Sequence, residues 1–112
     1  NHLACAAALA VLEVIQQDQL MENAAQVGTY LINELKQIEE IIEVRGRGLM
    51  IGIELPASLG HVKKDLLLKN RIFTGEAKPF VIRLLPALNM TKEHADQFLS
   101  ALKEHVKAVT VA

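Results

Sequence analysis

The sequence places one arginine inside a run of apolar residues. Arg83 lies in the middle of FVIRLLPAL, residues 80–88, which otherwise has the composition of a buried β-strand. A guanidinium keeps its charge at every physiological pH, and burying it without a partner is strongly unfavourable. Three interpretations remain: Arg83 reaches water, it pairs with a carboxylate of the protein, or it binds an anion from outside.

Alternation along this strand separates Arg83 from the core. Side chains at positions 80, 82 and 84 form the expected core face, whereas Arg83 lies on the opposite face between Val81 and Leu85. A planar guanidinium binds a carboxylate through two parallel hydrogen bonds. The strand therefore predicts either a carboxylate-binding arginine on a covered face or an arginine on an edge strand that reaches water or a glutamate.

A second arginine motif, RGRG at residues 45–48, is open to two interpretations. In an extended chain Arg45 and Arg47 lie on one side and the two glycines on the other. A phosphate or RNA site would suit two neighbouring guanidinium groups, but aromatic residues make up only 4% of the chain and no basic stripe accompanies the motif. The motif is therefore better explained as a bend that carries two arginines facing solvent or an interface.

The other reactive side chains do not form a recognisable site. The four histidines, at positions 2, 61, 94 and 105, lack the spacing of metal ligands. Cys5 has no local base and is expected to be a buried, inert thiol. The sequence contains neither a phosphate-cradling P-loop motif nor a nucleophile-elbow motif, and nothing marks any lysine as an activated amine.

Length and charge bound the class of protein. A chain of 112 residues is long enough for one soluble domain. Its net charge of −1 does not attract nucleic acid or an anionic membrane. No apolar run reaches the roughly 20 residues that a membrane helix needs. A single cysteine favours a reducing compartment, here the cytoplasm. Because a helix pattern follows Asn1 at once, without a signal peptide, we expect the chain to belong to a longer protein.

The elements that position Arg83 follow from hydrophobic periodicity and turn residues. Helices are predicted over residues 3–16, 18–38, 61–70 and 91–109, and strands within 41–55 and over 72–74 and 80–85, with a loop at 75–79. Asp18 and Thr91 are the expected N-caps of the second and last helices, and Gly28 is expected to permit close helix packing. This order predicts an α+β fold in which helices cover one face of a small mixed or antiparallel sheet.

Two of the predicted helices have distinct apolar patterns. The last one has an inward stripe of Ala95, Phe98, Leu99, Leu102 and Val106. The first has no polar side chain between Leu3 and Leu12 other than the thiol of Cys5. A helix that is apolar all round must be covered all round. We therefore expect part of the first helix to face another domain or subunit, the alternative being a central core helix.

Three segments together resemble the C-terminal domain of the class III, ornithine-type aminotransferases, which use pyridoxal phosphate. They are NHLACAAALAVLEVI at the start, VRGRGLMIGIEL in the middle and VIRLLPALNMTKE near the end. The resemblance covers essentially the whole chain in order and is nearest to the acetylornithine branch of the family. His2 and Ala87 stand where the family usually has proline.

The resemblance implies a fold and a reaction. Residues 1–112 would be the C-terminal small domain of a fold-type I enzyme, with residues 1–16 a helix leading out of a large domain. The enzyme would transfer the terminal amino group of an N-acylornithine to 2-oxoglutarate as a homodimer. The family's cofactor-binding lysine lies upstream in the large domain, so this chain alone is expected to be inactive and to hold no pyridoxal phosphate.

The resemblance also gives Arg83 a role. Its motif matches the position at which the family places an arginine that binds a substrate carboxylate, whereas Arg45 and Arg47 receive no role. Two alternatives from other classes remain open: a stand-alone regulatory module that binds a carboxylate metabolite through Arg83, and a structural domain that dimerises through its first helix. The sequence does not distinguish an acetyl from a succinyl group on the ornithine.

Overall fold

A single antiparallel sheet organises the molecule. The computed structural model describes the backbone of residues 1–111 and the side chains of residues 1–107, and in this part of the chain four strands pair in the order β1-β2-β4-β3. The strands are β1 (Glu43–Arg47), β2 (Met50–Glu54), β3 (Gly75–Lys78) and β4 (Val81–Leu84). The helices are α1 (His2–Gln17), α2 (Leu20–Lys36), α3 (Val62–Asn70) and α4 (Lys92–Val111), with a short 3-10 turn, η1, at Ala57–Leu59.

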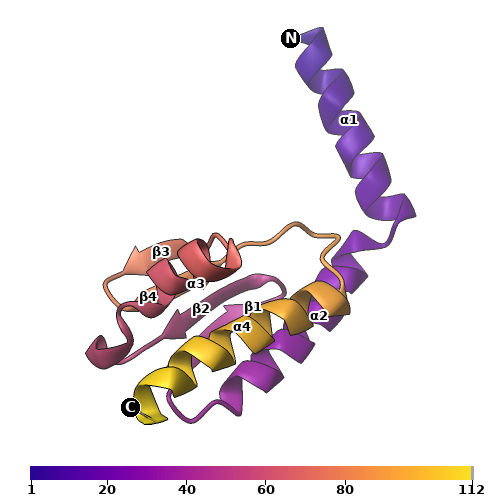
Figure 1. Cartoon of the computed structure of the whole chain (residues 1–112). Helices are drawn as coiled ribbons and strands as arrows, with labels where there is room; N and C mark the ends of the chain where they lie inside the picture. The colour runs from indigo at the N-terminus through magenta and orange to yellow at the C-terminus, as the bar shows by residue number, and fades with distance from the viewer. Residues whose placement is uncertain (112) are drawn as a thin grey trace.

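The hydrophobic core lies between one face of the sheet and three helices, α2, α3 and α4 (Figure 1). Ile51, Ile53, Ile82 and Leu84 point from the sheet into this layer, where they join Leu31 and Leu35 of α2, Val62 and Leu66 of α3, and the buried stripe of α4. That stripe is the predicted one, and all five of its members are buried. The predicted α+β architecture, with helices on one face of the sheet, is therefore confirmed.

A glycine in α2 allows the helix to touch the β1–β2 hairpin. A Cβ atom on Gly28 would lie 2.8 Å from the Cα of Gly48 and closer still to the Gly48 carbonyl group. Gly48 itself turns the hairpin with a φ of +58°, in the left-handed region that glycine adopts without steric cost. The close helix packing predicted at Gly28 is therefore confirmed, and the partner of the helix is a strand turn.

One predicted strand is misplaced. Residues 72–74 are irregular, and β3 forms instead over Gly75–Lys78, the segment predicted to be a loop. The backbone amide of Ile72 bonds to the carbonyl oxygen of Leu66 and so finishes α3. Phe73 is 83% exposed. The apolar composition of residues 72–74 predicted a strand, but the first of them forms a backbone hydrogen bond to the end of α3. The more polar segment that follows, residues 75–78, pairs with β4 instead.

Phe80 is also placed differently from its prediction as a core residue. It lies with Pro79 in the two-residue turn between β3 and β4, has a φ of +69° and leaves 47% of its surface exposed. Its ring covers Gly60, where a Cβ atom would come within 3.0 Å of the ring carbon Cε1. The tight turn takes Phe80 out of the strand alternation, and Val81, the next residue, is buried.

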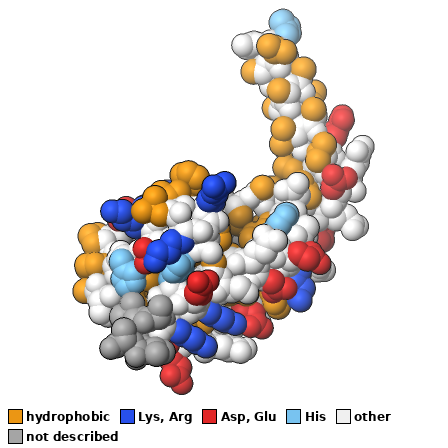
Figure 2. Space-filling model, viewed as in Figure 1, with side chains coloured by type: hydrophobic (Ala, Val, Ile, Leu, Met, Phe, Trp, Pro, Cys, Tyr) orange, Lys and Arg blue, Asp and Glu red, His pale blue; other side chains and the backbone are white. Residues whose placement is uncertain are grey.

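Helix α1 projects away from the rest of the molecule (Figure 1). Asn1 caps it, because its Oδ1 accepts hydrogen bonds from the backbone amides of Leu3 at 2.9 Å and Ala4 at 3.3 Å. None of residues 2–17, all of which the structure describes, is buried, and Figure 2 shows apolar side chains along the projecting helix. The helix is therefore apolar and uncovered within the described part of the chain.

The bend between α1 and α2 corrects another prediction. Asp18 ends α1 rather than capping α2, and the cap position of α2 is Gln19, which adopts a left-handed φ of 51° and makes no side-chain cap bond. Among the described residues no single helix is long and apolar enough to cross a bilayer; α1 and α2 reach that length only together, and a bend of 61° separates them.

Candidate functional site

Strand register brings Arg83 into a row of four residues across the sheet. Arg45 of β1 pairs with Gly52 of β2, Gly52 pairs with Arg83 of β4, and Arg83 pairs with Gly75 of β3. Directly paired residues of antiparallel strands share a face. The neighbouring row, which contains Ile53 and Ile82, faces the core, so the row of Arg83 faces away from the helices.

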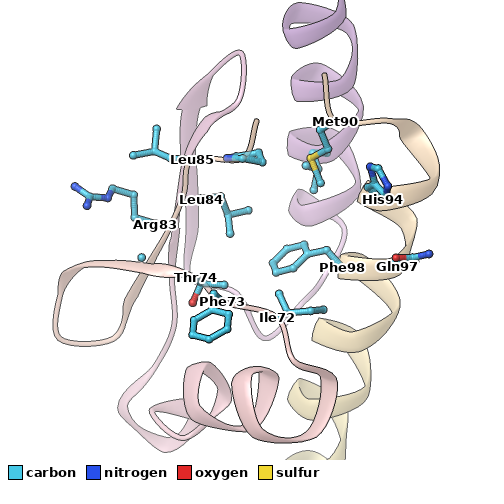
Figure 3. A pocket seen from close by; sticks show the side chains of 13 residues that line it. Ile72, Phe73, Thr74, Arg83, Leu84, Leu85, Met90, His94, Gln97 and Phe98 are labelled. Carbon is cyan, nitrogen blue, oxygen red and sulfur yellow. The ribbon is translucent and has the colours of Figure 1, made fainter. Parts of the chain in front are cut away.

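The environment of Arg83 is open and lacks an acidic partner. Its side chain is exposed and crosses Gly75, where a Cβ atom would lie 3.3 Å from the Arg83 Nε and 3.1 Å from its carbonyl oxygen. Figure 3 shows the guanidinium pointing away from α4, whereas Leu84 points toward it. No acidic side chain within residues 1–107 forms an ion pair with Arg83. Of the three interpretations, an internal carboxylate partner is thus excluded within these residues.

The other two arginines of this face differ from Arg83. Arg45 donates from Nη1 to the Glu43 Oε2 at 2.6 Å, and about half of each side chain is exposed, 50% and 52% respectively. Arg47 is exposed and pairs across the strands with Met50. Most of the RGRG segment is therefore the end of β1, and the predicted bend is confirmed only at Gly48, which turns the hairpin.

Beside the strand of Arg83 lies a cleft of about 400 Å³. Its walls are residues 72–75, the end of β4 with the residues that follow it, and the first half of α4 (Figure 3). The lining is mainly apolar, and Leu31 and Phe98 belong to the core cluster or pack on it. Thr74 contributes a buried hydroxyl oxygen that has no hydrogen-bond partner among the described residues. Sequence reasoning missed this cleft, because its walls come from three separate segments.

Two of the histidines, His94 and His105, form hydrogen bonds that stabilise the fold. His94 and Thr91 form a reciprocal cap at the start of α4: the His94 backbone amide donates to the Thr91 hydroxyl at 3.2 Å, and the Thr91 amide donates to the His94 Nδ1 at 3.3 Å. This confirms the cap predicted at Thr91. His105 is buried and its Nε2 bonds to Asn70. Within the described residues no group of three or more His, Cys, Asp or Glu side chains is arranged to hold a metal ion.

The structure places the Cys5 thiol and the Lys92 amine as follows. Cys5 was predicted to be a buried thiol, but it is exposed, because α1 projects from the core that would have covered it. Lys92 lies 4.9 Å above the ring of Tyr30 and bonds to Asp96 at 3.5 Å. The Asp96 charge, with a smaller effect of Tyr30, raises the pKa of Lys92.

Tyr30 completes this cluster, which joins α2 to α4. Its hydroxyl donates a short hydrogen bond to Asp96 Oδ1. That hydrogen bond is the main cause that raises the pKa of Tyr30 and lowers the pKa of Asp96. The cluster is therefore a structural link between the two helices, and it lies outside the row of Arg83.

The fold and this site define a small α+β domain that presents an arginine on the open face of its sheet. The same fold occurs in fold-type I aminotransferases that use pyridoxal phosphate. It matches the ornithine aminotransferase of Toxoplasma gondii with a TM-score of 0.84 at 26% identity, over 97% of this chain and 28% of that protein.

Sequence comparison assigns the family. The model of the family described as "Aminotransferase class-III" matches residues 1–106, so the chain belongs to this family. It is 40% identical over 104 residues to the acetylornithine aminotransferase of Nitrosomonas europaea, over 89% of this chain and 26% of that protein. It is 41% identical over 105 residues to the ornithine aminotransferase of an Exiguobacterium species, over 92% of this chain and 26% of that protein. The chain thus spans about a quarter of these relatives.

Proposed function

We propose that this chain is the C-terminal small domain of an aminotransferase that moves the terminal amino group of an N-acylornithine to 2-oxoglutarate, a reaction of arginine biosynthesis. Membership of the class III family and the names of the relatives support this proposal. In it, residues 1–16 lead out of a large domain, which covers the apolar surface of α1 together with the second subunit of a cytoplasmic homodimer.

Arg83 is the substrate-binding residue in this proposal. The observation that supports it is an exposed guanidinium on the open sheet face, bordered by Gly52 and Gly75 and without an acidic partner among residues 1–107. Gly52 leaves room beside the arginine for a planar carboxylate, whereas the space over Gly75 is occupied by the Arg83 side chain itself. Two parallel hydrogen bonds from one guanidinium fix both the position and the orientation of that carboxylate. A substrate held at its carboxylate presents its amine or keto group in a constant direction.

Pyridoxal phosphate, when bound, supplies the electron sink for amino-group transfer. We propose that the lysine and the phosphate-binding groups that hold it lie in the rest of the protein, so that residues 1–112 alone are inactive. In this scheme the present chain binds the carboxylate, orients the substrate and supplies one wall that excludes water.

Replacing Arg83 by alanine in the full-length protein tests this role. We expect kcat/KM for 2-oxoglutarate to fall by a factor that corresponds to about 2–4 kcal/mol of lost transition-state stabilisation, because a charged hydrogen-bonded pair is lost. Arg47→Ala is the matched control, because it removes the same charge from the same face at the far edge strand. An unchanged kcat/KM for both the amino donor and 2-oxoglutarate in Arg83→Ala would reject the role.

A further inference from the structure

Asn23 joins two parts of the chain that are 65 residues apart in sequence. Its side-chain amide, on α2, donates hydrogen bonds to the carbonyl oxygens of Leu88 at 2.7 Å and Met90 at 3.0 Å. Both acceptors are main-chain groups of the β4–α4 loop, residues 85–91. The amide nitrogen must face this loop, because the amide oxygen in its place would face two carbonyl oxygens and have nothing to accept from. One side chain therefore holds the loop at two points.

The same residue is bonded to the bend between α1 and α2. The backbone amide of Asn23 donates to the carbonyl oxygen of Gln19 at 3.0 Å, and Gln19 is the residue whose left-handed conformation turns the chain. The backbone of Asn23 is thus fixed at the base of α1 while its side chain is fixed on the β4–α4 loop.

The β4–α4 loop lies between the strand of Arg83 and helix α1. Its first residues, Leu85 and Pro86, continue β4 directly and line the cleft beside Arg83. Its middle residues, Leu88 and Asn89, line a shallow apolar groove against the base of α1, together with Ala10, Val11, Val14, Ile15 and Leu20. A shift of this loop therefore moves both the residues that contact the base of α1 and the residues that continue β4 beyond Leu84.

We propose that Asn23 is a positioning residue that sets Arg83 at a fixed place relative to α1. The inference rests on the proposed function, in which Arg83 binds the substrate carboxylate and α1 leads to the part of the protein that carries the cofactor. Asn23 does not touch substrate in this scheme. It acts through the β4–α4 loop, so its loss displaces the carboxylate anchor without removing it.

The first test uses Asn23→Asp in the full-length protein. Aspartate has the same shape, but its carboxylate donates no hydrogen bond and faces two carbonyl oxygens. We expect KM for 2-oxoglutarate to rise roughly tenfold, as a small displacement of a positioning group does, and to recover partly as pH falls and the new carboxyl takes up a proton. Tyr30→Phe is the matched control, because it removes another α2 hydrogen bond, to Asp96 on α4, and leaves the loop contacts intact.

A double-mutant cycle separates positioning from general damage. If Asn23 acts through Arg83, Asn23→Ala raises KM in the wild-type background and changes it less than about twofold in the Arg83→Ala background. Equal effects of Asn23→Ala in both backgrounds would overturn the inference. A KM for 2-oxoglutarate that Arg83→Ala itself leaves unaffected would instead reject the proposed substrate-binding role of Arg83, so the two failures are distinguishable.

Hydrogen exchange provides a readout that does not depend on activity. The amides of the β4–α4 loop should exchange faster in Asn23→Asp than in the wild type, by about tenfold or more, because two bonds that hold the loop are lost. Tyr30→Phe should leave the exchange of these amides unchanged. If the loop exchanges at the wild-type rate in Asn23→Asp, Asn23 does not hold it and the inference is wrong. Should Asn23→Ala fail to fold, Asn23→Asp alone decides the question through exchange and KM.

Discussion

The contact between α2 and the β1–β2 hairpin gives a prediction opposite in sign to the one from helix propensity. In a helix interior, alanine is about 1 kcal/mol more favourable than glycine, so Gly28→Ala should stabilise α2 considered alone. In the folded chain the added Cβ would lie 2.8 Å from the Cα of Gly48. Carbon atoms pack at about 3.5 Å or more, so this contact is too short by roughly 0.7 Å, and the carbonyl of Gly48 is nearer still.

The structure therefore predicts that Gly28→Ala destabilises the chain. Overpacking of this kind costs up to about 3 kcal/mol, and the gain in propensity offsets about 1 kcal/mol of it, which leaves a net loss of about 2 kcal/mol. The hairpin cannot easily yield, since Gly48 already has a φ of +58° and α2 is held by buried Leu31 and Leu35. Urea unfolding followed by circular dichroism measures the change in the free energy of unfolding.

Gly48→Ala is the control for this prediction. A Cβ on Gly48 has its nearest neighbour at 4.0 Å, so the substitution adds left-handed strain of about 1 kcal/mol but no clash. Gly28→Ala should be the more damaging of the two. A Gly28→Ala chain as stable as the wild type, or more stable, would show that the hairpin does not approach α2 as described.

Two further predictions concern the helices. The folded state lowers the pKa of Asp96, mainly through the hydrogen bond from Tyr30, so the ionised carboxylate stabilises the fold above its unfolded pKa and this contribution is lost as pH falls below about 4. In Asp96→Asn the urea midpoint should therefore change less between pH 7 and pH 3 than in the wild type. An unchanged pH dependence would contradict the role of the Asp96 carboxylate. The uncovered α1 should make the isolated 112-residue chain self-associate and bind an apolar dye, and the double substitution Leu9→Glu with Leu12→Glu should reduce both effects. Light scattering measures the association and dye fluorescence measures the binding. An unmodified chain that is strictly monomeric and binds no dye would contradict the inference that α1 is covered by another domain or subunit.

The sequence determined the elements whose evidence is local. The α4 stripe from Ala95 to Val106 repeats at helical spacing, and a helix with such a stripe buries it wherever it packs. The cap at Thr91 also follows from residue type at a helix start. The unusual character of Arg83 was visible for the same reason, since a charged residue inside an apolar strand contradicts its neighbours.

Tertiary structure decided what depends on pairing between distant segments. Arg83 lies between Gly52 and Gly75 only because of strand register, and Gly28 meets Gly48 only because α2 crosses a hairpin turn. Local periodicity indicates which face of a segment is apolar, but it does not indicate which distant segment pairs with that segment or packs against it. For that reason the apolar residues 72–74 were predicted as a strand although the polar residues 75–78 pair with β4, and Asn23 carried no signal in sequence because both of its acceptors are main-chain groups.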